Sequence, residues 1–160
     1  DEKWEIENYS KLFKKASTLT NIDVEQEILI KFLFNLSEKT SKKIIITTGT
    51  IDTKIINRLK ASSNKINESL YEINLNNTKG YLLINENFFS ISHLISKSSL
   101  FISCHGAFTH IASNYKIKIL DIIERNKTIH YSRITKHMKN YKHLYRDKFL
   151  KLSEEIINYS

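Results

Sequence analysis

The sequence predicts an α/β fold: a Rossmann-like, doubly wound parallel sheet with helices on both faces and a helical tail at the C-terminal end. Two observations support this fold class. Short aliphatic runs alternate along the chain with longer segments whose apolar residues recur at helical spacing. The aliphatic runs are also apolar throughout, which is typical of parallel strands that are buried on both faces.

Apolar periodicity predicts the elements of the first third of the chain. Residues at helical spacing place a helix over 4–16 and a strongly apolar helix over 24–38, with Asp23 as the cap of the second. Three consecutive isoleucines predict a buried strand over 43–48. Asp52 is then well placed to cap a third, shorter helix.

The middle of the chain is more polar. Residues 62–69 are interpreted as a loop, and alternation over 70–75 predicts a short strand. A turn over 76–80 and a further extended piece over 81–84 follow. Apolar residues at helical spacing then predict a helix over 88–98.

The stretch from residue 90 to residue 124 contains the main candidate site. A strand over 100–103 leads into Gly106, a helix over 107–114 follows, and a last buried strand covers 117–123. Glycine allows a sharp turn and a close approach of a ligand to the backbone. Free N–H groups at the start of the next helix attract anions. The sequence therefore predicts an anion site, for a phosphate above all, at this turn.

Two histidines flank that turn. His105 lies in the loop and His110 about one helical turn later, so both could donate hydrogen bonds to phosphate or ribose oxygens. For His110 the alternative is a half-buried helix histidine bonded to neighbouring backbone. The polar turn Thr47-Thr48-Gly49-Thr50 could also bind a diphosphate, although ordinary turns use the same residue types.

The last predicted strand is bounded by two carboxylates, Asp121 and Glu124. Either could hold ribose hydroxyls, or form a salt bridge with the basic tail. A zinc site at Cys104, His105 and His110 is disfavoured, because adjacent ligands cannot easily share one tetrahedral centre. A nucleophilic Cys104 with a histidine base is a further interpretation, but a single cysteine beside a histidine is common by chance.

Charge and composition set wider limits. The net charge is +8 with a pI near 9.4, and the basic tail over 125–160 interleaves tyrosines with lysines and ends in a helix predicted over 141–159. One cysteine allows no internal disulfide and suggests a reducing compartment. The chain has no run of about 18 apolar residues and no signal peptide. It opens at Asp1 without Met, which suggests a fragment.

These residues give the chain a resemblance to a known family. The run Leu100 to Ala112 resembles a motif near the end of heptosyltransferase-like (family 9-like) GT-B glycosyltransferases, in which a strand leads into Asp-Ser/Thr-Gly and then His-x-Ala. The opening Asp1 to Tyr9 looks like that family's lysine-bearing loop and following helix. In two respects the sequence departs from the motif: Cys104 takes the place of the Asp, and His110 comes four residues after Gly106 instead of three.

The resemblance implies the donor-binding, C-terminal half of a glycosyltransferase that transfers a sugar from a nucleotide-sugar to a surface-glycan or lipopolysaccharide acceptor. Residues 1–124 would form the nucleotide-sugar domain, without its first strand, and 125–160 a basic helical tail that packs on it. The catalytic base would lie in the missing N-terminal half. The donor-binding residues implied are Lys3, Thr48, Gly49, Thr50, Cys104, His105, Gly106, Ala107, Thr109, His110 and Glu124.

No metal or other cofactor is expected. The expected partners are the nucleotide-sugar, the missing half of the enzyme and a glycan or glycolipid acceptor. The protein is expected in the cytoplasm, where it could make peripheral contact with the inner face of an anionic membrane. Nucleic acid is not expected as a partner. The alternative is a non-enzymatic basic α/β module that binds nucleic acid or an anionic membrane surface through the tail.

Overall fold

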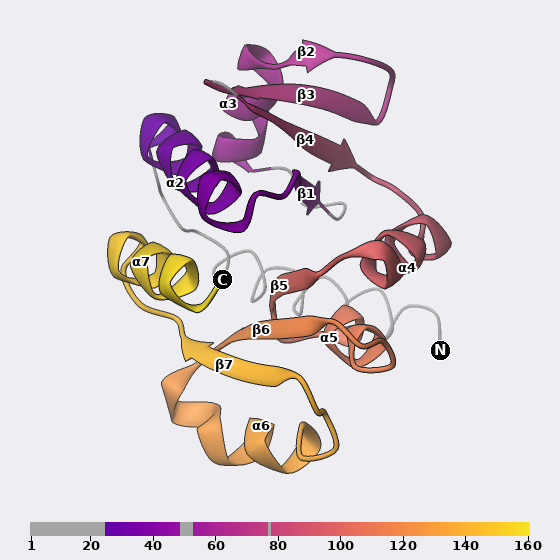
Figure 1. Ribbon diagram of the computed structural model, residues 1–160, viewed down its shortest axis with the longest axis vertical. Helices are drawn as coiled ribbons and strands as arrows, with labels where there is room; N and C mark the ends of the chain where they lie inside the picture. Colours follow the sequence, from indigo (N-terminus) through magenta and orange to yellow (C-terminus); the bar gives the residue numbers. More distant parts are fainter. Residues whose placement is uncertain (1–24, 49–52, 77) are drawn as a thin grey trace, which may run out of the picture.

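The computed structural model describes residues 25–48, 53–76 and 78–160, and it confirms the α/β class. The described helices are α2 (Gln26–Thr40), α3 (Lys54–Ser62), α4 (Phe88–Lys97), α5 (Ala107–Ala112), α6 (Thr128–Ile134) and α7 (Phe149–Tyr159), with a 3-10 turn, η1 (Arg125–Lys127). The described strands are β1 (Ile44–Thr48), β2 (Asn64–Lys65), β3 (Leu70–Leu75), β4 (Thr78–Ile84), β5 (Leu100–Cys104), β6 (Lys118–Ile123) and β7 (Tyr141–Tyr145) (Figure 1).

The strands form two hydrogen-bonded sheets instead of one continuous parallel sheet. The first has the order β1-β4-β3-β2, with β1 and β4 parallel and the other pairs antiparallel. The second has the order β5-β6-β7 and is parallel throughout. The first sheet is mixed because a tight turn joins β3 to β4, with Asn76 in the left-handed region at φ 63°.

That hairpin corrects two expectations for the middle of the chain. The turn predicted over 76–80 is shorter, because β4 already begins at Thr78. Gly80 therefore lies inside a strand, and a Cβ there would meet the Leu75 side chain at 3.0 Å. The loop predicted over 62–69 contains the short strand β2, which pairs with β3.

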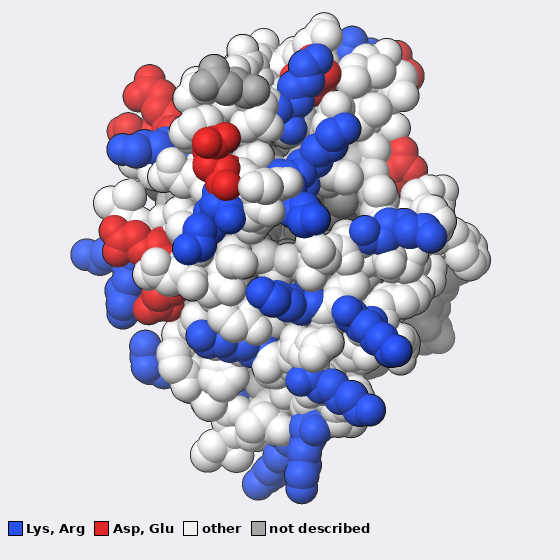
Figure 2. All heavy atoms as spheres, in the orientation of Figure 1, with Lys and Arg blue, Asp and Glu red and all other residues white. Residues whose placement is uncertain are grey.

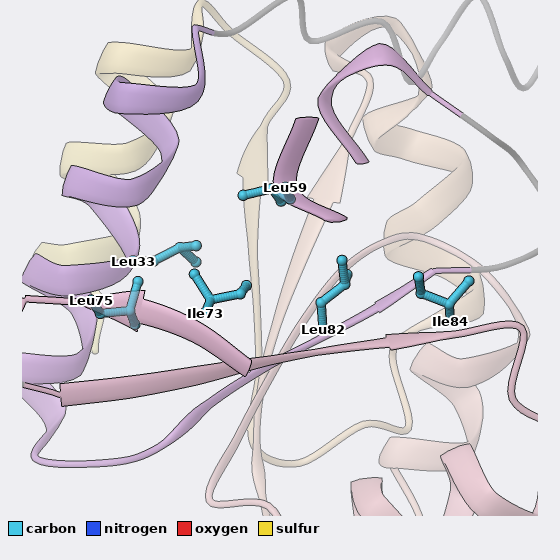
Figure 3. Close-up of a cluster of buried hydrophobic side chains, with 6 residues drawn as sticks. All are labelled: Leu33, Leu59, Ile73, Leu75, Leu82 and Ile84. Carbon is cyan, nitrogen blue, oxygen red and sulfur yellow. The ribbon is translucent and has the colours of Figure 1, made fainter. Parts of the chain in front are cut away.

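Helices cover both faces of the sheets. On one face, α2 and α3 enclose a buried apolar cluster against β3 and β4 (Figure 3). Its members are Leu33, Leu59, Ile73, Leu75, Leu82 and Ile84. On the opposite face, Leu83 of β4 and Phe101 of β5 pack against a cluster formed by α4, α5 and β6. Each fully buried aliphatic side chain contributes about 1.5–3 kcal/mol to stability.

A further cluster connects the two sheets. Ile44 of β1 and Leu100 of β5 both pack against the buried residues Leu36, Leu120 and Leu152, which come from α2, β6 and α7. Figure 1 shows α2 and α7 side by side, and the rings of Phe32 and Phe149 meet edge to face between them at 5.5 Å. The two sheets therefore share one layer of covering helices.

The C-terminal tail differs from its prediction. The helix expected over 141–159 is wrong, because Tyr141–Tyr145 is the strand β7 and α7 begins only at Phe149. Leu144 packs toward α7, while Tyr141 lies in the cluster on the opposite face of the sheet. This alternation has the period of a strand. The tail thus supplies the third strand of the parallel sheet.

The ends of the helices differ in detail from expectation. Thr53 caps α3, with its hydroxyl accepting the Ile56 N–H at 3.3 Å. The expected caps Asp23 and Asp52 and the helix predicted over 4–16 lie outside the described residues. The helix predicted over 107–114 is shorter, since α5 ends at Ala112. None of the described helices is long and apolar enough to cross a membrane.

Candidate functional site

The carboxyl ends of the three parallel strands meet at one edge of the second sheet. Cys104 ends β5, Arg125 follows β6 after one residue, and Arg146 follows β7 directly. The Arg146 N–H donates to the Ile123 carbonyl at 2.8 Å, which extends the pairing of β6 and β7 by one residue. We refer to Cys104, Gly106, Arg125 and Arg146 as the carboxyl edge. In α/β sheets of this kind, ligands bind outside the carboxyl ends of the strands.

A buried hydrogen-bond network lies directly beneath the carboxyl edge. His105 Nδ1 lies 2.5 Å from Asp121 Oδ2, and the Tyr141 hydroxyl donates to the same oxygen at 2.9 Å. Asp121 is fully buried and the His105 side chain is 10 % exposed. Asp121 was expected at a strand end, where it could hold ribose hydroxyls. The structure corrects this, because the residue pairs with Ser103 and His143 within the sheet.

Burial also affects Tyr141. Loss of solvent raises the pKa of its phenol well above the ordinary value, and the hydrogen bond and negative charge of Asp121 raise it further. The phenol therefore stays protonated and keeps donating to the carboxylate at neutral pH. Asp121 Oδ2 is thus in hydrogen-bond contact with two side chains that come from different elements, the loop after β5 and the strand β7.

Aromatic rings surround His105. The Tyr131 ring of α6 lies 4.6 Å from the imidazole, centroid to centroid, and the His110 ring lies 5.2 Å away. His110 in turn stacks on His137 at 6.1 Å. His105 is therefore packed beneath α6 and is less exposed than a loop histidine. His110 is half-buried in α5 and lies among aromatic rings. This burial agrees with the alternative interpretation of His110 as a half-buried helix histidine.

The turn at Gly106 does not need a glycine for its backbone. Its φ is −177° and its ψ is −171°, an extended conformation that any residue adopts. The sharp, glycine-dependent turn expected from the sequence is therefore corrected. Among the described residues, a Cβ at Gly106 would meet the Cys104 carbonyl oxygen alone, at 3.8 Å. The glycine leaves open space at the carboxyl edge, which a ligand could occupy.

Thr109 supports this turn from inside. Its hydroxyl accepts the Gly106 N–H at 3.3 Å and lies 3.1 Å from the Ser103 hydroxyl, and the residue is fully buried. The Gly106 N–H is thus used within the protein. The helix that follows has only 6 residues. Its dipole is correspondingly weaker than the sequence suggested, and positive side chains have to supply most of the attraction for an anion.

Arginines supply that charge. The Arg125 guanidinium lies 4.1 Å from the centroid of the Tyr145 ring, and Arg146 Nη2 donates to Cys104 Sγ at 3.2 Å. Among the described residues, neither guanidinium forms an ion pair with a carboxylate. The carboxylates that neighbour these arginines in the sequence are paired with lysines, Glu124 with Lys127 and Asp147 with Lys151, each at 2.6 Å.

Those lysine pairs agree with the direction of the pKa shifts. Hydrogen bonding to Glu124 raises the pKa of Lys127, and hydrogen bonds from Lys151 and from the Lys148 backbone lower the pKa of Asp147. Lys127 and Lys151 are thus each paired with a carboxylate. Arg125 and Arg146 therefore remain as the cationic groups best placed to bind an anionic ligand.

The remaining expected contacts have different positions. Lys3, Gly49 and Thr50 lie outside the described residues, and Thr48 ends β1 in the other sheet. Ala107 is exposed beside Gly106. Cys104 is exposed, but His105 Nδ1 is taken by Asp121, so the structure does not form the Cys104–His105 pair of the nucleophile reading.

Sequence reasoning missed Arg125, Arg146 and the bond between His105 and Asp121. Arg125 follows a predicted strand almost directly, and this position was the available signal. Arg146 had no such signal, because residues 141–145 were interpreted as a helix. Asp121 was recognised as a carboxylate near a strand end, but sequence spacing does not show which side chain faces it.

Two surface hollows lie elsewhere. One of about 670 Å³ follows α2, with Gln26, Phe34 and Asn76 in its lining. Another of about 340 Å³ lies near the start of β1 and β4, at the opposite end from the carboxyl edge. Both hollows are open to solvent, and neither is lined by residues of the carboxyl edge or of the buried hydrogen-bond network. Within the described part of the chain, no group of three or more His, Cys, Asp or Glu residues could hold a metal ion.

Comparisons of the chain with models of known protein families, with curated proteins and with solved structures gave no match. The geometry of the described residues is therefore the basis for the function proposed next.

Proposed function

We propose that this chain is the donor-binding half of a GT-B-type glycosyltransferase, and that it holds the diphosphate of a nucleotide-sugar at the carboxyl edge. One observation carries the proposal: Arg125 and Arg146, without ion-pair partners among the described residues, follow two neighbouring parallel strands at the edge where Gly106 follows β5, and Arg146 contacts Cys104 at the end of β5. Guanidinium groups bind phosphate oxygens in a planar, two-pronged geometry. The position at the ends of parallel strands also fits a nucleotide ligand.

The proposed chemistry is electrostatic. Sugar transfer leaves additional negative charge on the departing nucleoside diphosphate, and the two guanidiniums would stabilise that charge. The acceptor in this proposal is a glycan or glycolipid of the cell surface, with the catalytic base on the other half of the enzyme. Donor binding through arginines requires no metal.

The proposal is tested by calorimetric titration of the protein with a panel of nucleoside diphosphates. Loss of one charge-assisted hydrogen bond costs about 1.5–3 kcal/mol. Arg146→Gln should therefore weaken binding about 10- to 100-fold. Lys118→Gln is the matched control, because Lys118 is exposed at the first residue of β6, at the opposite end of the strand from Arg125.

Lys118→Gln should bind nearly as well as the wild type. Absence of binding for every nucleoside diphosphate would exclude the proposal. So would an equal loss in the two variants, because it would reflect overall charge instead of a site at the carboxyl edge.

A second candidate is binding to an anionic membrane surface. Figure 2 shows acidic side chains gathered in the upper and left parts of that view, while lysines and arginines cover the lower half. Lys118 and Lys142 both lie over the Tyr159 ring, at 5.9 Å and 4.5 Å from its centroid. Clustered lysines of this kind attract anionic lipids in a salt-dependent way.

Sedimentation with phosphatidylserine-containing vesicles distinguishes the two candidates. A membrane-binding module should lose binding in the double variant Lys118→Gln/Lys142→Gln and in high salt, and it should be unaffected by Arg146→Gln. Binding that does not respond to the two lysines would argue against this candidate.

A further inference from the structure

Asp121 is a buried acidic residue that the proposed anion site does not yet explain. Placing an ionised carboxylate away from water costs several kcal/mol unless hydrogen bonds or a positive charge compensate it. Only Oδ2 is compensated, by His105 and Tyr141. In the part of the chain that the structure describes, Asp121 Oδ1 is the one buried side-chain nitrogen or oxygen without a hydrogen-bond partner.

The other nitrogen of His105 is in a different situation. Nε2 makes no hydrogen bond within the described residues, yet it is not among the buried unpartnered atoms. Nε2 therefore keeps contact with the surface, in agreement with the 10 % exposure of the side chain. Since Nδ1 is taken by Asp121, Nε2 is the ring atom that is left for a ligand.

The groups that face His105 differ in charge. His110 comes from α5, Tyr131 from α6 and Asp121 from β6, and among the described residues Asp121 is the one carboxylate in contact with the ring. A carboxylate at Nδ1 fixes which ring nitrogen carries a proton and holds the orientation of the ring.

We infer that Asp121 is a positioning residue for His105, and that it holds the imidazole so that Nε2–H donates to a phosphate oxygen of the ligand at the carboxyl edge. In the complex, the imidazolium donates Nδ1–H to the carboxylate and Nε2–H to the phosphate, and the additional proton comes from solvent. This inference rests on the proposed function, because it assigns a role within the same anion site.

The first test reads the wild-type protein directly and uses one variant only to assign its signals. Long-range ¹H–¹⁵N correlation spectra report the protonation of each nitrogen of His105, which is assigned by its absence from the His105→Ala spectrum. We expect a protonated Nδ1 in the free protein, and both nitrogens protonated when a nucleoside diphosphate is added. A free protein with protonated Nε2 and bare Nδ1 would overturn the inference.

The second test separates positioning from stability. Asp121→Asn keeps the shape of the side chain and an oxygen for Nδ1 but removes the charge. Substitution of groups that hold a ligand-binding histidine in metal sites weakens binding about 10- to 100-fold, and we expect a similar loss here. Tyr141→Phe is the matched control, because it removes the other donor to Asp121 Oδ2. It should change the affinity for the ligand less than about threefold. It should also lower thermal stability, because a hydrogen bond to a buried group is lost.

The double variant His105→Ala/Asp121→Asn should bind no more weakly than His105→Ala alone, because Asp121 acts through His105. Additive losses, or an Asp121→Asn protein that is less stable but binds with wild-type affinity, would show that Asp121 is only structural. If the wild-type protein binds no diphosphate, the proposed function fails. The spectrum of the free protein still decides whether Asp121 holds the His105 ring through Nδ1.

Discussion

Single residues in the buried network couple stability to pH. Tyr141 has a folded-state pKa that burial and Asp121 raise above the ordinary phenol value of 10.0. A group with a raised pKa contributes its full stability below the unfolded-state pKa, and the contribution is lost as pH rises through the folded-state value. For Tyr141 this loss begins near pH 10 and continues at higher pH.

Tyr141→Phe should therefore lower the free energy of unfolding by about 1.5–3 kcal/mol at pH 7, the range for a hydrogen bond to a charged group. Above about pH 10 the difference between wild type and variant should shrink, because unfolding then lets the wild-type phenol ionise. Urea unfolding at pH 7, 9 and 10.5 measures this difference. A gap that stays constant at all three pH values would contradict the assigned role of Tyr141.

Residue spacing could predict part of the candidate site. The sequence placed Cys104, His105 and Gly106 at the end of a strand, and β5 does end at Cys104. It could not predict that Asp121 accepts from His105, because that contact depends on the register of β5 and β6. Side chains that meet across a sheet are determined by pairing, and no local pattern encodes it.

At the scale of elements, helix ends are stabilised by short polar side chains. Asn87 caps α4, with its side-chain oxygen accepting the Ser90 N–H at 3.0 Å. The cap stabilises the helix that begins with the exposed residues Phe88 and Phe89. It therefore holds in place a helix start that packing alone does not bury.

Asn87→Ala should lower the free energy of unfolding by about 1 kcal/mol, the usual value for a lost N-cap. Asn57→Ala provides the control, because Asn57 is exposed within α3 and caps nothing. Alanine has the higher helix propensity, so this control should be neutral or slightly stabilising. Thermal unfolding followed by circular dichroism compares the two, and equal destabilisation would contradict the capping role.

The strand β7 shows where element prediction reached its limit. Residues 141–145 form a strand of 5 residues next to an amphipathic helix, and in sequence such a segment resembles an extension of that helix. Long periodic elements such as α2 were predicted correctly, because many turns of the pattern agree. Residues 141–145 form a strand instead of a helix because they pair with β6, and this long-range contact is not visible in the local sequence.

At the scale of the molecule, the layer formed by α2 and α7 joins both sheets. Leu152 of α7 is 1 % exposed and belongs to the cluster that includes Ile44 of β1 and Leu120 of β6. The described protein is therefore expected to unfold as one cooperative unit, although its two sheets are separately hydrogen-bonded.

Leu152→Ala should lower the free energy of unfolding by about 2–5 kcal/mol, as large-to-small changes in a core do. Leu150→Ala is the control on the same helix, because Leu150 is 62 % exposed, and it should stay within about 0.5 kcal/mol of the wild type. Amide hydrogen exchange should show faster exchange in both sheets for Leu152→Ala. Faster exchange confined to β5, β6 and β7 would show that the sheets unfold independently.

The contact between Phe32 and Phe149 has a consequence for synthesis in the cell. The ribosome synthesises α2 before α7, so the apolar side of α2 lacks its contacts with α7 while the intervening strands are being synthesised. Until α7 has emerged, these apolar side chains of the nascent chain are exposed to solvent. A nascent chain of this protein is therefore expected to need a chaperone most while α7 is still inside the exit tunnel.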